Sequence, residues 1–232
     1  MKDFSPSLAD GSPPDIYFVD MDGTLLSTSS EKYFLQRLVA SGRLGVFRFL
    51  RFMGQYLLHP ARTLREGKGW NRSYLRGMEE DVAAREAEEC ACRLLRDRVR
   101  PWTLASAREM AAGGTPTVLL SASLSYLATA VARELGFSTV RASRPETEGG
   151  RLTGRLPGVR PWGRDKVRVA ERVCEEAGTA LNRCAAAGDS WSDRFLLERC
   201  GLPIAVCPDR KLERLARNRG WKVVEGKKVR WA

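Results

Sequence analysis

The sequence predicts an α/β fold with a doubly wound, mainly parallel sheet. Short apolar runs alternate with amphipathic helical stretches along most of the 232-residue chain, which is the pattern of parallel strands joined by crossover helices. Several of these runs end directly in a carboxylate or hydroxyl residue, as strands do where an open sheet carries its functional site. Residues from about 30 to 100 contain no strand-like run and are expected to form an inserted all-helical segment.

The first expected element is a buried strand at the apolar run 16–19. A helix over 31–40 follows, with Ser27–Ser30 as its N-cap region and Glu31 in its first turn. Further helices are expected where apolar residues recur at helical spacing or alanine is frequent, over residues 44–58, 79–99, 103–112, 124–135, 164–177, 191–200 and 212–218. Further strands are expected at short apolar runs, over residues 116–120, 139–141, 184–187, 203–206 and 221–224.

Glycine and proline mark the expected ends of these elements. His59-Pro60 ends the helix before it, and Gly67-Lys68-Gly69 predicts a break within the insert. Gly136 is expected as a helix C-cap, and Gly149-Gly150 as the turn of a hairpin.

Two domains are expected. Pro101-Trp102 marks a boundary, so we expect residues 29–101 to form the helical cap domain and residues 1–28 and 102–232 to form the α/β core. Hydrophobic residues make up 43% of the chain, which is enough for a substantial core and excludes global disorder.

The sequence contains no recognisable targeting segment and no cysteine pattern typical of a metal site. The first 14 residues are polar and lack the regions of a signal peptide, and no apolar run approaches the length of a membrane span. We therefore expect a cytoplasmic location. The six cysteines form no CxxC pair and no histidine cluster accompanies them, so neither zinc nor a disulfide framework is expected.

Basic charge is concentrated in two zones of a chain whose formal net charge is +11. Residues 43–76 carry eight Arg or Lys and one Glu, and residues 208–232 carry nine Arg or Lys and three acidic residues. The rest of the chain has a net charge of −2. Such zones predict an anionic partner or surface. Nucleic acid is not the expected partner, because no recognised motif accompanies the charge.

Residues 16–25 read Ile-Tyr-Phe-Val-Asp-Met-Asp-Gly-Thr-Leu and combine a strand with two carboxylates at its end. Asp20 and Asp22 can enter one crevice if the chain leaves strand geometry at Met21. One of them is then a candidate nucleophile and the other a candidate acid and base. Taken alone, the stretch also fits a surface Asx-turn.

Three further sites follow apolar runs or begin helices. Ser121, with the backbone N–H of Ala122 at the start of a helix, can hold a phosphoryl oxygen. Lys166 near a helix start can neutralise phosphoryl charge. Asp189 is a hard oxygen ligand suited to Mg²⁺, and Asp193, one turn later, can orient Lys166 or a metal-bound water. Each residue alone has an ordinary structural explanation, whereas all four sites in order are hard to explain by chance.

The stretch Asp20–Leu25 resembles the Asp-x-Asp-Gly-Thr-Leu signature of the haloacid dehalogenase (HAD) superfamily of phosphotransferases. The resemblance covers about residues 15 to 224 and is greatest to the subfamily IB hydrolases, the group of phosphoserine phosphatase. It implies a Rossmann-like core with a helical cap between the first two motifs. The stretches that resemble this subfamily in particular are Leu119–Ser123, Gly150–Gly154, Gly163–Lys166 and Ala205–Asp209. Phosphoserine phosphatase usually has Ser-Gly-Gly at 121–123 and Gly-Asp-Gly-x-Asn-Asp at 188–193, and these departures count against phosphoserine as the substrate.

By this resemblance, Asp20 attacks phosphorus and forms an aspartyl-phosphate, while Asp22 protonates the leaving oxygen and then deprotonates water. The implied Mg²⁺ ligands are the Asp20 carboxylate, the Asp22 main-chain carbonyl and Asp189. Residues implied in phosphate binding or in support of the site are Gly23, Thr24, Ser121, Ala122, Lys166, Ser190 and Asp193. Asp22 argues against dehalogenation, and a Ser-His-Asp site is excluded because His59 is the only histidine.

The expected function is Mg²⁺-dependent hydrolysis of a small phosphomonoester similar to phosphoserine or histidinol phosphate. Alternatives are a phospholipid phosphatase at the membrane surface, a non-catalytic module that binds anionic ligands, and phosphoryl transfer to an acceptor other than water. The basic, aromatic segment 43–65 fits either cap packing with solvated arginines or a helix on an anionic membrane surface. Glu31 is a candidate for gripping a substrate ammonium group, and a helix-dipole role explains it equally well.

Overall fold

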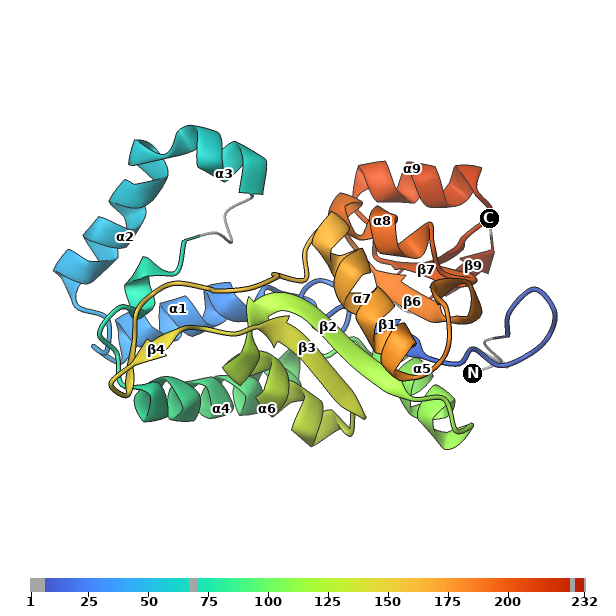
Figure 1. The fold of residues 1–232 in the computed structure, drawn as a ribbon, viewed down its shortest axis with the longest axis horizontal. Helices are drawn as coiled ribbons and strands as arrows, with labels where there is room; N and C mark the ends of the chain where they lie inside the picture. Colours follow the sequence, from blue (N-terminus) through green and yellow to red (C-terminus); the bar gives the residue numbers. More distant parts are fainter. Residues whose placement is uncertain (1–6, 67–70, 226–227, 232) are drawn as a thin grey trace.

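The computed structural model describes residues 7–66, 71–225 and 228–231, and its centre is one twisted sheet (Figure 1). The described strands of this sheet run in the order β3-β2-β1-β6-β7-β8-β9. All neighbours pair in parallel except β9, which pairs antiparallel with β8. The strands are β1 Tyr17–Val19, β2 Thr117–Leu124, β3 Thr139–Ser143, β6 Ala185–Gly188, β7 Leu202–Val206, β8 Lys222–Glu225 and β9 Lys228–Trp231. The expected α/β fold with a mainly parallel sheet is confirmed.

Helices cover both faces of the sheet, and the side chains of β1 show why. Tyr17 and Val19 belong to one hydrophobic cluster, whereas Phe18 between them belongs to the other, because successive strand residues point to opposite faces. The first cluster includes residues of α5 and α6, and the second includes residues of α7, α8 and α9. These helices span Pro101–Ala112, Ser125–Leu135, Arg164–Glu176, Arg194–Leu197 and Arg210–Asn218.

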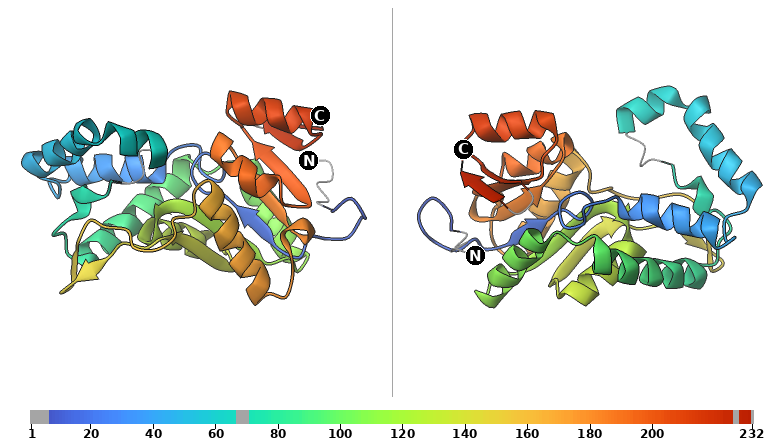
Figure 2. Two further views of the ribbon diagram at one scale, coloured as in Figure 1. Left: turned by 45° about the horizontal axis from the view of Figure 1, so that its top comes forward. Right: turned by 180° about the vertical axis from the view of Figure 1, so that it is seen from behind.

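The chain between β1 and α5 forms a helical insertion at one end of the sheet (Figures 1 and 2). Its elements are α1 Ser30–Ala40, α2 Val46–Leu58, α3 Pro60–Glu66, the 3₁₀ turn η2 Ser73–Leu75 and α4 Glu80–Asp97. Buried Phe34 of α1 and Leu94 of α4 share one hydrophobic cluster with Leu127 of α6. The insertion is therefore packed onto the core rather than tethered to it.

A short hairpin from the core also pairs with the insertion. Strands β4 Thr147–Glu148 and β5 Arg151–Leu152 are antiparallel, and Gly149-Gly150 forms the turn as predicted. The Leu152 N–H donates to the Met78 carbonyl, and the Gly77 N–H donates to the Leu152 carbonyl. Backbone hydrogen bonds thus join this hairpin of the core to the insertion.

Several element boundaries differ from the expectations. His59 ends α2 as predicted, but Pro60 starts the additional helix α3, since proline is well accommodated in a first helical turn. The expected helix over 191–200 is the 3₁₀ turn η4 Trp191–Asp193 followed by the single turn α8. Strand β2 extends to Leu124, and β9 was not expected. The break predicted at Gly67-Lys68-Gly69 lies outside the described residues.

None of the helices in the part of the chain described here is both long enough and apolar enough to cross a membrane. The expected C-cap is confirmed, because Gly136 ends α6 in the left-handed conformation at φ 78°, which glycine adopts at little cost.

Lys222 of β8 makes the unfolding free energy depend on pH. Its side chain is buried, and burial lowers its pKa to about 8, while Glu109 opposes this shift. An unfolded lysine has a pKa of about 10.4, so the unfolded chain binds more protons between these values and stability rises with pH there. We expect Lys222→Met to flatten the dependence of Tm on pH between 8 and 10. Exposed Lys211→Met is the control, and equal pH slopes in all three proteins would contradict the assignment.

Candidate active site

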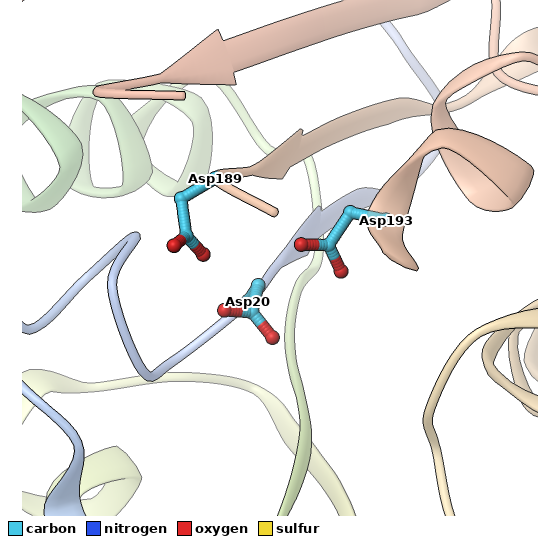
Figure 3. Close-up of side chains that lie close together, drawn as sticks. All are labelled: Asp20, Asp189 and Asp193. Atoms are coloured by element: carbon cyan, nitrogen blue, oxygen red, sulfur yellow. The ribbon is translucent and has the colours of Figure 1, made fainter. Parts of the chain in front are cut away.

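Three carboxylates meet at the carboxyl edge of two neighbouring strands (Figure 3). Asp20 follows β1 directly, Asp189 follows β6 directly, and β1 pairs in parallel with β6. Asp193 ends the turn η4 and points at both. Each residue offers a carboxylate oxygen, and these atoms all lie within 4.8 Å of one another. Asp20, Asp189 and Asp193 are therefore brought together as the sequence predicted.

Lys166 supplies the positive charge of this cluster from the first turn of α7. Its Nζ donates to Asp20 Oδ1 at 2.5 Å and to Asp193 Oδ1 at 2.6 Å, with 4% of its side chain exposed. Burial lowers the pKa of Lys166. The charges of Asp193 and Asp20 raise it by a larger amount, so the net pKa is above the usual value. The lysine is therefore a fixed, buried cation.

Asp193 is held from both sides. Its Oδ2 accepts hydrogen bonds from Ser190 N at 3.0 Å and Ser190 Oγ at 2.7 Å, which makes a capping box at the start of η4. Although burial opposes it, the Lys166 charge holds the pKa of Asp193 below its usual value. Gly188 is required beside it, because a Cβ at this position would lie 2.6 Å from the Asp193 Cβ.

Asp189 lies against the first loop. Thr24 Oγ1 donates to Asp189 Oδ1 at 2.9 Å. Gly23 has a φ of 90°, and a Cβ there would lie 2.1 Å from Asp189 Oδ2, so only glycine fits. Burial, followed by the charge of Asp193, raises the pKa of Asp189 to about 7. Burial also raises the pKa of Asp20 well above its usual value, against the opposing charge of Lys166.

Asp22 has a different environment, built from neutral donors. Its Oδ1 accepts the Ser30 N–H of helix α1 at 3.0 Å, and its Oδ2 accepts Ser123 Oγ of β2 at 2.6 Å. Burial raises the pKa of Asp22, while the hydrogen bonds from Ser123 and Ser30 oppose the shift. The pKa is raised for both Asp20 and Asp22, but their donors differ: Asp20 contacts the Lys166 ammonium, whereas Asp22 contacts neutral groups. A carboxyl held by neutral groups is suited to proton transfer.

A cavity of about 170 Å³ lies at this edge of the sheet. Its lining residues are Asp20, Asp22, Ser121, Ala122, Ser123, Pro161, Trp162, Lys166, Asp189, Ser190, Ser192 and Asp193. Most of the predicted site residues therefore share one cavity. Gly23 and Thr24 lie beside it, where Thr24 binds Asp189 and the Gly23 carbonyl accepts from Arg100 Nε at 2.8 Å.

One local expectation was wrong, and one functional candidate was missed. Ala122 does not begin a helix, because β2 continues through it to Leu124 and α6 starts only at Ser125. The register of β2 shifts between Leu120 and Leu124, and Ser121, Ala122 and Ser123 all line the cavity. Ser121 Oγ accepts the Ser123 N–H at 3.1 Å. Sequence reasoning missed Ser123 because it ended the strand at Leu120.

Glu31 lies outside the residues that line the cavity. Its carboxylate forms an ion pair with buried Arg72 and accepts Tyr74 Oη at 2.8 Å. The predicted contact between Glu31 and a substrate ammonium group stays a prediction, and Arg72 provides the present partner of this carboxylate.

The donor set of the cluster fits a hard divalent cation. Asp193 already binds Lys166 and Ser190 through its two oxygens, which leaves Asp20 and Asp189 as the better carboxylate donors. Burial and neighbouring carboxylates disfavour the ionised forms of Asp20 and Asp189 and so raise the pKa of both groups. A cation there would stabilise the ionised forms. The Asp22 carboxylate is occupied by Ser30 and Ser123, so the predicted contribution of this residue through its main-chain carbonyl does not compete with those bonds.

The fold and the site define an α/β protein with an open parallel sheet and an acidic cluster at its carboxyl edge. Comparison with known families gives the name of the family. Residues 17–198 match the model of the haloacid dehalogenase-like hydrolases. The chain belongs to this family, as the sequence motifs predicted.

Similar proteins include several with named activities. Phosphoserine phosphatase SerB1 of Mycobacterium tuberculosis is 27% identical over 89% of this chain and 69% of its own length. A histidinol-phosphatase of Neisseria meningitidis is 25% identical over 90% of this chain and 97% of its own. A Bordetella pertussis protein of unknown function has a solved structure that matches with a TM-score of 0.79 and 26% identity, covering 92% of this chain and 99% of its own.

The pairing of Lys166 with two buried carboxylates predicts a large stability change on its removal. In metal-free buffer, we expect Lys166→Met to lower the free energy of unfolding by about 3–5 kcal/mol, because it leaves buried charge uncompensated. Urea denaturation measures this. The double variant Lys166→Met, Asp193→Asn should recover part of the loss, since one unpaired carboxylate is then removed. A double variant as unstable as the sum of its single variants would contradict the coupling.

Proposed function

We propose that the protein is a Mg²⁺-dependent phosphomonoester hydrolase that uses Asp20 as its nucleophile. The observation that carries this proposal is the contrast between two neighbouring carboxyls. Asp20 accepts a hydrogen bond from the Lys166 ammonium at 2.5 Å, whereas Asp22 accepts hydrogen bonds from a neutral hydroxyl and a backbone N–H. Opposite environments of this kind separate a nucleophile from an acid.

The proposed reaction has two steps. An Asp20 carboxylate oxygen attacks phosphorus, the bond from phosphorus to the ester oxygen breaks, and the proton of Asp22 goes to the leaving oxygen. Asp22, now ionised, takes a proton from a water molecule whose oxygen attacks the aspartyl-phosphate, and the bond from phosphorus to Asp20 breaks. Free phosphate and both carboxyls are returned in their starting forms.

The other cavity residues position the phosphoryl group in this proposal. Lys166 and the hydroxyl of Ser121, with the backbone N–H of Ala122, bind its oxygens, and the Gly23-Thr24 loop supports them. Mg²⁺ held by Asp20, Asp189 and the Asp22 main-chain carbonyl would neutralise nucleophile and phosphoryl charge together. Ser190 and Asp193 support Lys166 through the capping box.

We propose a small phosphorylated metabolite as the substrate, with a cytoplasmic location. The support is that two similar proteins are named phosphoserine phosphatase and histidinol-phosphatase. Glu31 follows Ser30, whose N–H donates to Asp22, and the charge of Asp22 acts on the Glu31 carboxyl. An ammonium group on the substrate would have to compete there with Arg72.

A phospholipid phosphomonoester is a second candidate substrate, favoured by exposed apolar side chains on α2. A non-catalytic module is a weaker alternative, because Asp20, Asp22, Lys166 and Asp189 line one cavity. Transfer to another acceptor uses the same aspartyl-phosphate, and adding a competing alcohol separates it from hydrolysis by the products formed.

Phosphate release from a substrate panel tests the proposal. The panel contains p-nitrophenyl phosphate, phosphoserine, histidinol phosphate and phosphatidylglycerophosphate in micelles, each with and without Mg²⁺. We expect Mg²⁺-dependent turnover that falls by at least about 10³-fold in Asp20→Asn, since the nucleophile is lost. Asp165→Asn, a half-buried carboxylate on the same helix as Lys166, is the matched control. Turnover that survives in Asp20→Asn would show that another residue is the nucleophile.

A further inference from the structure

Large apolar side chains are exposed together on helix α2 and at Leu64 of α3. Seven of the eleven exposed large hydrophobic residues in the described chain fall between 46 and 64, with exposed fractions from 45% to 89%. They are Val46, Phe47, Leu50, Met53, Leu57, Leu58 and Leu64, and we call them the apolar arm face. Figures 1 and 2 show α2 and α3 standing away from the sheet. The apolar arm face therefore has no packing partner among the described residues.

The opposite side of α2 is already anchored. Phe52 is buried, and its ring lies edge-on against Tyr74 with 5.1 Å between ring centroids. Tyr56 packs on Phe52 at 5.4 Å, and Asn71 Nδ2 donates to the Phe52 carbonyl at 3.0 Å. Packing within the insertion thus uses a narrow side of the helix and leaves the apolar arm face exposed. Packing within the insertion accounts for the apolar side chains of Phe52 and Tyr56, but it does not account for the exposed apolar side chains of Phe47 and Leu57.

The charged side chains of α2 are both arginines. Arg48, Arg51 and Gln55 form a stripe that a helical repeat of 100° per residue places apart from Leu50 and Leu57. No acidic residue occurs from 43 to 65, whereas five arginines do. Two copies of this chain joined by the apolar arm face would bring Arg48 and Arg51 of both copies together, so charge disfavours a dimer and favours an anionic surface.

We propose that the apolar arm face docks on an anionic lipid bilayer. Thirteen residues give α2 a length of about 20 Å, which is too short to cross a bilayer but suits a helix lying in the interface. The apolar arm face enters the boundary between headgroups and acyl chains, and the arginines bind lipid phosphates. This surface is separate from the catalytic cavity and does not depend on the proposed hydrolysis.

Flotation with lipid vesicles tests this inference with the full chain and no substrate. The vesicles contain phosphatidylcholine alone or with about one third phosphatidylglycerol. We expect binding to the anionic vesicles only, weakened by salt because the arginine contacts are electrostatic. The variant Phe47→Gln, Leu50→Gln, Leu57→Gln keeps the net charge and uses a good helix former, and it should bind at least tenfold more weakly. Val39→Gln, Val159→Gln removes exposed apolar groups elsewhere and should bind like the parent.

Each other outcome overturns the proposal. Equal binding by the triple variant would show that net charge alone attracts the protein. Absence of binding by the parent protein would exclude a lipid-docking role, and a dimer lost in the triple variant would assign the apolar arm face to a second copy. Circular dichroism checks that each variant is folded. Asp20→Asn should bind vesicles like the parent, so a failure of the proposed chemistry and a failure of docking are measured separately.

Discussion

A single buried ammonium holds the carboxylate cluster at the edge of the sheet together. Lys166 binds Asp20 after β1 and Asp193 after β6, so one cation from α7 joins two strands to a helix that comes from a third part of the chain. Because charges buried without a partner are costly, the surrounding structure is arranged to satisfy this cluster. The capping box at Ser190 fixes Asp193, and glycine at 188 leaves space for its side chain.

The same constraint separates the two carboxyls of the first loop. The parallel pairing of β1 with β6 places Asp20 beside Asp189, where negative charge accumulates. Asp22 leaves this cluster and binds Ser123 and the Ser30 N–H instead. Two residues of identical chemistry thereby acquire different surroundings, because the chain leaves strand geometry after Val19. Gly23, directly after Asp22, has the positive φ that lets the turn continue.

Sequence patterns predicted the strand ends that carry site residues. They missed features that form only by contact between separate parts of the chain. Apolar runs that end in polar residues located Asp20, Ser121 and Asp189, because strand ends in parallel sheets share one edge. Lengths of short elements were less predictable: α3 begins directly after the end of α2, and β9 forms only by pairing with β8. The partner of Glu31, Arg72, is 41 residues away and comes from a turn that has no periodicity to reveal it.

The hydrogen bond from Ser30 to Asp22 joins the helical insertion to the carboxyl for which we propose proton transfer. Here the first residue of α1 supplies a donor to the group assigned to proton transfer. An insertion exchanged between relatives would therefore alter acid strength together with specificity, unless it presented an N–H group at the same place. Evolution of substrate choice in this chain is constrained by the backbone of its own cap.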